Sequence, residues 1–318
     1  MSNQCLICSG EVNQDFEYHP ACARQLFGRE RTPILDYDAG ELAELAELAK
    51  KAVKHRVTVP GVQAKLSLEV NNQSQETPKL TIVGLWGRFI LKPSSNKWPQ
   101  LPENEHCTLM MAEAVGIETV PYGLIRLKSG ELAFITRRID RKEDGSKVAM
   151  EDMAQLTKRL TEDKYKGSHE QIAKVIKRYS SNPLFDVVRF FELILFCYLT
   201  GNADMHLKNF SLLKDQELGW KLAPAYDLLS TRLLIPEKAD PEELALTLNG
   251  KKSNFTKNVF KIFGQNIGLT VKQIENLFKK LERKLPDLKN VVKSSFLSDE
   301  MKDGYLSIIE SRYDNLYS

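Results

Sequence analysis

The sequence lacks any long uninterrupted apolar run. Its most apolar segment, residues 184–200, is broken by Asp186, Arg189 and Glu192. A membrane-spanning helix needs about 20 predominantly apolar residues, so this segment is predicted to be a buried helix of a globular protein. The first residues also lack the basic and apolar regions of a secretory signal peptide. We therefore expect a protein that is neither exported nor held in a membrane.

Charge of one sign and cysteine are both scarce. The chain has 45 Lys and Arg against 42 Asp and Glu, a formal net charge of +3 over 318 residues. So balanced a composition gives no general argument for an anionic membrane surface or for nucleic acid. Five cysteines are too few for a disulfide scaffold. Cys107 and Cys197 are predicted to be small core residues with free thiols. Free thiols are expected in a protein of the reducing cytoplasm.

The other three cysteines gather near the N-terminus with one histidine. The pattern is Cys5-x2-Cys8 followed by His19-x2-Cys22, a Cys₃His spacing that suits one tetrahedral zinc ion. An element of this size, residues 1–30, cannot bury enough apolar surface to fold by itself, so a bound metal would supply the missing stability. The alternative is three ordinary thiols and one histidine.

Two regions of different secondary structure are predicted after this element. Residues 31–139 begin with a helix at 38–56 and continue with short β-rich runs around one helix at about 103–115. Residues 140–318 are predicted to be mostly helical, and Pro286 is expected to end one of these helices. The predicted strands are 57–59, 65–70, 80–83, 88–92, 122–127 and 132–136, and the later helices are 150–160, 169–178, 184–199, 271–285 and 297–316. This order predicts an α+β chain with a small β-rich N-terminal lobe and a larger helical C-terminal lobe.

The most informative motif is an Asp, an Asn five positions later and a second Asp beyond a short hairpin. Asp204 and Asn209 have the protein-kinase interval, residues 210–213 and 220–222 predict the hairpin, and Asp227 follows it. In protein kinases the first Asp accepts the proton of the substrate hydroxyl, whereas the Asn and the second Asp hold magnesium ions on the ATP phosphates. A lone Asp in such a loop would be interpreted as a turn or cap residue. The three together favour phosphoryl transfer.

A kinase-like site also needs a lysine and a loop over the phosphates. Lys92 ends an apolar strand and is the candidate for the lysine that reaches the α- and β-phosphates, with Glu105 on the following helix as its predicted partner. The predicted phosphate loop consists of Pro60, Gly61, Val62, Gln63, Ala64 and Lys65. Its single glycine matches neither the P-loop nor the protein-kinase Gly-rich signature. Its backbone N–H groups could still cradle phosphates, and a plain hairpin turn is the alternative.

Together these motifs resemble the HipA/HipT family of bacterial serine/threonine toxin kinases. The resemblance covers roughly residues 56–318, and its motifs fall in the family's order. The matching segments are residues 61–68, 89–94, 101–106, 138–141, 151–153, 202–210 and 222–227. The longer HipA members carry an extra N-terminal subdomain that this sequence does not show, so the chain is similar to the compact HipT-like branch. The N-terminal cysteine cluster is not part of the best-known members.

The resemblance implies a role for each motif residue. It implies that Asp204 is the catalytic base, that Asn209 and Asp227 are magnesium ligands, and that Lys92 binds phosphate. The other nucleotide-site residues implied are His206, Lys208 and Tyr226, together with Arg137 and Ile139 at a hinge that contacts adenine through its backbone. Thr58, three residues before Gly61, has the position of the family's autophosphorylation site, and a plain strand residue is the alternative.

The family resemblance also implies an activity. It implies an ATP- and Mg²⁺-dependent protein kinase toxin in the bacterial cytoplasm, whose substrates are an aminoacyl-tRNA synthetase and the chain itself. The implied partner is an antitoxin of the HipB or HipS type, and contact with nucleic acid is expected only through that antitoxin. Two alternatives remain: a non-catalytic kinase-fold module that docks an antitoxin or nucleic acid, and a small-molecule kinase with the same phosphoryl machinery.

Overall fold

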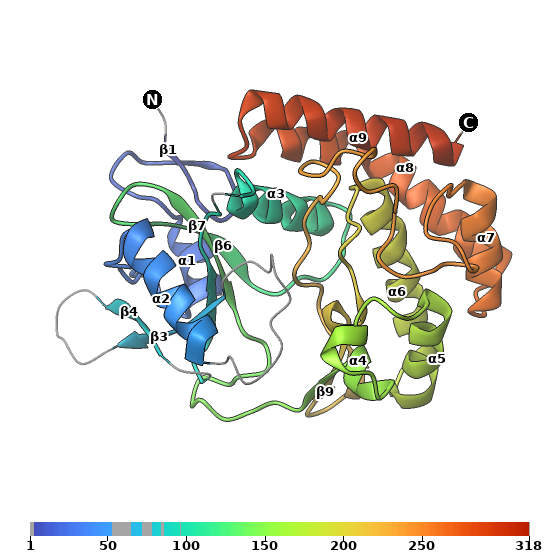
Figure 1. Cartoon of the computed structure of the whole chain (residues 1–318), viewed down its shortest axis with the longest axis horizontal. Coiled ribbons are helices and arrows are strands. Elements are labelled where there is room, and N and C mark those ends of the chain that lie inside the picture. Colours follow the sequence, from blue (N-terminus) through green and yellow to red (C-terminus); the bar gives the residue numbers. More distant parts are fainter. Residues whose placement is uncertain (1–2, 53–64, 72–77, 84–85, 96, 318) are drawn as a thin grey trace. The chain divides into compact units, whose positions relative to one another are not determined.

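The computed structural model describes residues 3–52, 65–71, 78–83, 86–95 and 97–317 (Figure 1). These residues form two compact units. The first comprises Met1–His106 and Val120–Lys147, and the second comprises Cys107–Thr119 and Val148–Ser318. None of the described helices is both long enough and apolar enough to cross a membrane. Several predictions lie outside the described residues: the strand 57–59 with Thr58, and Pro60, Gly61, Val62, Gln63 and Ala64 of the phosphate loop.

A five-stranded antiparallel sheet organises the first unit. In spatial order its strands are β4 (Lys79–Ile82), β3 (Leu66–Asn71), β5 (Phe89–Lys92), β7 (Leu132–Arg137) and β6 (Tyr122–Arg126). Burial alternates along β3, where Leu66, Leu68 and Val70 are buried, as expected for an antiparallel sheet with one face on a core. The strands predicted within the described residues of this unit are confirmed, with end shifts of no more than one residue.

Two predicted helices accompany this sheet. Helix α2 (Ala39–Ala52) follows Asp38, whose carboxylate accepts from Glu41 N while Asp38 N donates to the Glu41 carboxylate. This reciprocal pair is a capping box, which starts the helix. Helix α3 (Leu101–Ala114) confirms the helix predicted at 103–115. Its residues up to His106 belong to the first unit and the rest to the second.

The N-terminal element covers the exposed edge of this sheet. It contains strands β1 (Asn3–Gln4) and β2 (Glu11–Val12) and helix α1 (Pro20–Phe27). The backbone N–H of Leu124 in edge strand β6 donates to Leu6 O at 2.7 Å, and the Tyr18 hydroxyl donates to Leu124 O at 2.8 Å. A Cβ on Gly123 would lie 2.7 Å from Ile7 Cγ1, so only glycine permits this approach. The element thereby satisfies backbone groups that an open sheet edge would expose.

The second unit is mostly helical. Its helices are α4 (Met153–Leu156), α5 (His169–Tyr179), α6 (Pro183–Leu199), α7 (Lys257–Asn266), α8 (Val271–Ser294) and α9 (Asp299–Tyr317), with 3-10 turns η1 (Thr161–Asp163) and η2 (Leu207–Asn209). Every residue of α6 from Leu193 to Leu199 is buried, which confirms the predicted buried helix. Helix α6 packs against α5 and α9, and α8 and α9 lie side by side (Figure 1).

A three-stranded sheet completes this unit, in the order β10 (Gly219–Leu222), β9 (Ser211–Asp215), β8 (Met150–Asp152). Strands β9 and β10 are the predicted hairpin. The helix predicted at 150–160 is wrong: β8 pairs with β9, and only Met153–Leu156 is helical. Asp152 ends the strand and caps α4, because its carboxylate accepts from Gln155 N at 2.8 Å.

Two further differences concern the C-terminal helices. Pro286 does not end its helix but lies inside α8. A proline removes one helical hydrogen bond, and here the burial of Leu288 and Val292 offsets that loss. Helix α7, which contains Gly264, was not predicted. That glycine allows close packing, since a Cβ there would lie 2.6 Å from Ile274 Cδ1.

Candidate active site and Cys/His cluster

The loop after α6 carries Asp204 in a fixed backbone conformation. Gly201 adopts a left-handed φ of 68°, which turns the chain at the end of the helix. Asn202 is completely buried, and its side-chain oxygen accepts from Asp204 N at 3.0 Å. Thr231 bridges the same loop, accepting from Ala203 N at 2.9 Å and donating to Gly201 O at 3.1 Å. Hydrogen bonds with the side chains of Asn202 and Thr231 therefore fix the backbone that leads to Asp204.

Asn209 lies against Asp204. Its side-chain amide donates to the backbone carbonyl of Asp204 at 3.1 Å, and His206 N donates to the same carbonyl at 2.8 Å. The amide N–H₂ is thereby used within the loop, which leaves the Asn209 side-chain oxygen as an acceptor. Such an amide oxygen is one of the oxygen ligands that suit a hard cation such as Mg²⁺.

Asp227 approaches the same loop through its neighbour Tyr226. The Tyr226 hydroxyl donates to Lys208 O at 3.1 Å and also bonds the Ser211 hydroxyl at 2.6 Å. Asp227 itself has a φ of 59°, the left-handed region that non-glycine residues rarely adopt. Such a conformation persists where the surrounding structure determines it, and it is frequent at functional sites. The structure therefore brings the segments of Asp204, Asn209 and Asp227 together in the second unit.

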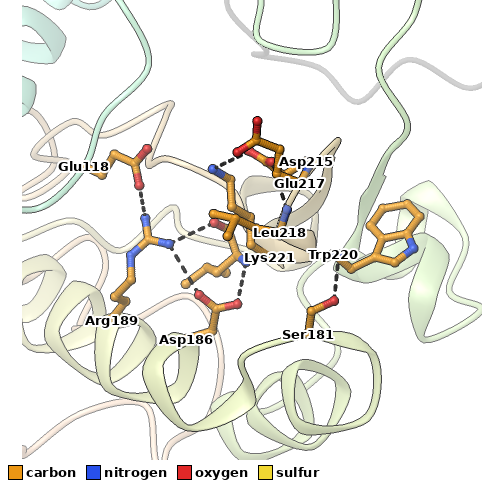
Figure 2. A network of polar contacts seen from close by, with 10 residues as sticks. Glu118, Ser181, Asp186, Arg189, Asp215, Glu217, Leu218, Trp220 and Lys221 are labelled. Atoms are coloured by element: carbon orange, nitrogen blue, oxygen red, sulfur yellow. Dashed lines mark hydrogen bonds and ion pairs between the residues drawn. The ribbon is translucent and has the colours of Figure 1, made fainter.

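A polar network anchors the strand that leads to Asp227. Figure 2 shows the Arg189 guanidinium between Glu118 and Asp186. Arg189 donates to the Glu118 carboxylate at 2.5 Å and to Leu222 O at 3.0 Å, while buried Asp186 accepts from Leu222 N at 2.8 Å. Further along, Ala225 N donates to Glu118 O at 2.7 Å. Helix α6 and Glu118 thus fix both ends of the segment from Leu222 to Ala225.

Tyr165 was not predicted as a site residue, yet its hydroxyl donates to Asp204 Oδ1 at 2.5 Å. Burial raises the pKa of the Tyr165 phenol, and the negative charges of Asp204 and Asp227 raise it further. The ring of His206 packs edge-on against Tyr165, with 5.0 Å between centroids. Burial lowers the pKa of His206, although the charge of Asp204 opposes that shift. No sequence signal connects Tyr165 with Asp204, because the two are 39 residues apart.

Lys208 and the two residues predicted at the hinge, Arg137 and Ile139, belong to different parts of the structure. Lys208 Nζ pairs with Asp152 Oδ2 at 2.9 Å, which joins the η2 turn to the cap of α4. Arg137 ends β7; its N–H donates to Pro121 O at 2.9 Å, so this N–H is engaged within its own unit. Ile139 follows two residues later and is half-buried.

In the first unit, Lys92 does pair with Glu105. Lys92 Nζ lies 2.5 Å from Glu105 Oε1, and the two side chains are 4% and 1% exposed. Lys92 is the last residue of β5, and Glu105 lies in the N-terminal half of α3. Lys65, the one described residue of the predicted phosphate loop, is exposed and precedes β3.

The N-terminal cluster also assembles. The ligand atoms of Cys5, Cys8, His19 and Cys22 all lie within 4.8 Å of one another. His19 directs Nδ1 at the thiols, 3.3 Å from Cys8 Sγ, and its Nε2 lies 2.9 Å from Glu11 O. In metal-binding histidines, a hydrogen bond from the second ring nitrogen to a carbonyl oxygen fixes the orientation of the ring in this way. Burial raises the pKa of the Cys5 thiol, but backbone N–H bonds, first that of Cys8, outweigh it and lower the pKa overall. Three thiols and one imidazole at this spacing suit a tetrahedral metal ion.

Known proteins share both the sequence pattern and the fold. The family model described as HipA-like C-terminal domain matches residues 57–288. A Haemophilus influenzae protein named "Putative kinase" is 29% identical over 283 residues, which cover 80% of each chain. A Sinorhizobium fredii protein named "Putative kinase Y4mE" is 30% identical over 233 residues, 70% of this chain and 54% of that one.

Two solved structures resemble the fold. One is the complex of HipA, HipB and operator DNA from the Shewanella oneidensis MR-1 toxin–antitoxin system. It matches with a TM-score of 0.68 and 20% identity, over 86% of this chain and 71% of that chain. The other is the Helicobacter pylori proinflammatory kinase CtkA, with a TM-score of 0.55 and 13% identity, over 78% of this chain and 93% of that chain. These matches confirm the predicted α+β kinase-like fold.

Proposed function

Because the chain belongs to the HipA-like C-terminal domain family, we propose that it is an ATP- and Mg²⁺-dependent protein kinase acting on serine or threonine hydroxyls. The proposal is supported by relatives that bear kinase names. The observation that carries it is the meeting of Asp204, Asn209 and the segment of Asp227 within one loop system. A turn or cap role for Asp204 alone would not account for that arrangement.

In the proposed reaction, the substrate hydroxyl oxygen attacks the γ-phosphorus of ATP and the bond from that phosphorus to the bridging oxygen breaks. Asp204 accepts the hydroxyl proton. Asn209 and Asp227 would hold Mg²⁺ by side-chain oxygens, and this ion supplies charge neutralisation at the phosphates. Lys92, oriented by Glu105, binds the α- and β-phosphates. We also assign the nucleotide site to His206, Lys208, Tyr226, the hinge at Arg137 and Ile139, and residues 60–65.

The proposed biological role is that of a toxin. We propose an aminoacyl-tRNA synthetase as substrate, self-phosphorylation at Thr58, and an antitoxin of the HipB or HipS type as partner in the bacterial cytoplasm. The Shewanella oneidensis structure, which contains HipB and operator DNA, supports a partner of this class. A small-molecule kinase is the second candidate, because the same catalytic residues transfer phosphate to small hydroxyl compounds.

Labelled ATP tests the proposed activity. The purified wild type is expected to transfer the γ-phosphate to itself or to a synthetase in the presence of Mg²⁺. Asp204→Asn should abolish transfer, because an amide accepts no proton from the hydroxyl. Asp163→Asn is the matched control, since Asp163 lies in the same unit and pairs with Lys166. Equal labelling by wild type and Asp204→Asn would refute the mechanism.

The Cys/His cluster is proposed to bind one structural zinc ion. The purified protein should contain about one zinc per chain, the capacity of one Cys₃His site. Changing Cys5 and Cys8 to Ser should remove the metal and lower the melting temperature of the first unit. Cys107→Ala, which removes a buried thiol outside the cluster, should keep the metal. Elemental analysis of protein kept reduced throughout purification decides the question, and a metal-free wild type would reject the proposal.

A further inference from the structure

Asp204 already has a hydroxyl donor. The Tyr165 hydroxyl donates to Asp204 Oδ1 at 2.5 Å, and both residues belong to the second unit. A general base lies within about 2.6–3.2 Å of the oxygen whose proton it accepts. Tyr165 therefore places a hydroxyl at hydrogen-bonding distance from the proposed base, as an acceptor serine or threonine would.

The position of Tyr165 is determined by its surroundings. Its ring packs against His206, and the backbone carbonyl of neighbouring Lys164 accepts from Leu207 N at 3.1 Å. These contacts join the segment of Tyr165 to the loop that carries Asp204. The residue is nevertheless 41% exposed, so its side chain can rotate towards solvent without opening the core. The contact therefore lies at the surface of the unit, where a competing hydroxyl can reach it.

The Tyr165 phenol is suited to donate a hydrogen bond to Asp204 and not to act as the nucleophile in phosphoryl transfer. Burial and the charges of Asp204 and Asp227 raise its pKa, so the phenol stays protonated at neutral pH. A protonated phenol offers Asp204 one hydrogen bond and competes with any other hydroxyl for the same oxygen.

On the premise of the proposed kinase activity, we propose that Tyr165 occupies the acceptor-hydroxyl position on Asp204 until a serine- or threonine-containing protein segment displaces it. Tyr165 is then a positioning residue that sets how readily an acceptor reaches the base. It contributes no covalent step. Tyr165 itself is not among the residues assigned to the nucleotide site, and Tyr165→Phe keeps the ring against His206, so ATP binding should not depend on the hydroxyl.

The kinetic test uses Tyr165→Phe, which keeps the ring against His206 and removes only the hydroxyl. The assay supplies Mg²⁺, labelled ATP and a mixture of serine- and threonine-containing peptides with random flanking residues. The KM for peptide should fall by about two- to tenfold, the factor that one net hydrogen bond contributes, while the KM for ATP stays constant. Tyr179→Phe is the matched control, because Tyr179 is also 41% exposed. An unchanged peptide KM, a loss of kcat at constant peptide KM, or label on Tyr165 itself would overturn the proposal.

A second measurement does not require activity. In protein with ¹³C-labelled tyrosine, the Tyr165 resonance is identified by its loss in Tyr165→Phe. Its pKa should lie above that of free tyrosine and fall in Asp204→Asn, because the neighbouring charge is removed. An ordinary pKa that Asp204→Asn leaves unchanged would show that the contact is absent and overturn the proposal. If the contact is detected but the wild type transfers no phosphate, the kinase proposal fails and the acceptor role of Tyr165 fails with it.

Discussion

Lys92 and Glu105 form the most deeply buried ion pair among the described residues, with side chains 4% and 1% exposed. Lys92 Nζ also lies 5.3 Å from the centroid of the Phe134 ring. An ammonium group in such surroundings has lost its solvation and depends on its carboxylate partner. The Glu105 carboxylate therefore helps to position the Lys92 ammonium group and compensates its buried charge.

Replacing either partner alone, as in Glu105→Gln or Lys92→Met, should lower the free energy of unfolding by about 3–5 kcal/mol, because the other charge stays buried without its partner. The double variant Lys92→Met/Glu105→Gln should lose less than the sum of the two single losses, yet transfer no phosphate. Urea denaturation of the four proteins measures this coupling. Single losses that simply add in the double variant would show that the two side chains do not act as a pair.

At the scale of elements, helix α6 both contributes buried residues to the core and positions the segment that leads to Asp227. Arg189 and Asp186 near its N-terminus bind both backbone groups of Leu222, five residues before Asp227. Arg189 also holds Glu118, whose backbone carbonyl accepts from Ala225 N. The helix therefore positions the strand that delivers a proposed magnesium ligand.

Arg189→Lys should weaken this positioning, because an ammonium group cannot reproduce the planar guanidinium's bonds to two partners. We expect the KM for Mg-ATP to rise by about tenfold and the free energy of unfolding to fall by about 1–3 kcal/mol, the cost of leaving buried acceptors unsatisfied. Arg178→Lys on α5 is the matched control, since its guanidinium lies over the neighbouring Tyr179 ring. Steady-state kinetics and thermal unfolding that do not distinguish the two variants would argue against the positioning role.

Elements with a local signal were predictable, and elements fixed by distant partners were not. The β9–β10 hairpin follows from its own apolar runs and turn. Strand β8 is only three residues long and exists because it pairs with β9, some 60 residues later. Pro286 is tolerated inside α8 because its helix is packed along one side, which a local helix-breaking rule does not consider.

At the scale of the whole molecule, the parts of the site with a local sequence signal were predictable, and the parts formed by residues far apart in the sequence were not. Asp204 and Asn209 are five residues apart, so their joint chemistry is visible in the sequence, as is the Cys/His spacing of the N-terminal cluster. Tyr165 reaches Asp204 across 39 residues, and His106 reaches Ile7 O across 99. No spacing rule connects such pairs, because the fold alone brings them together.

The most direct measurement titrates ATP into wild type, Asp204→Asn and Asp227→Asn with and without Mg²⁺, and then follows γ-phosphate transfer in a single turnover. Asn is the replacement of choice at 227 because it tolerates the left-handed φ of 59° found there. Mg²⁺ should tighten ATP binding to wild type and to Asp204→Asn but not to Asp227→Asn, and only wild type should transfer phosphate. Equal Mg²⁺-dependent binding and equal transfer rates in all three proteins would contradict a shared metal–nucleotide site at these residues.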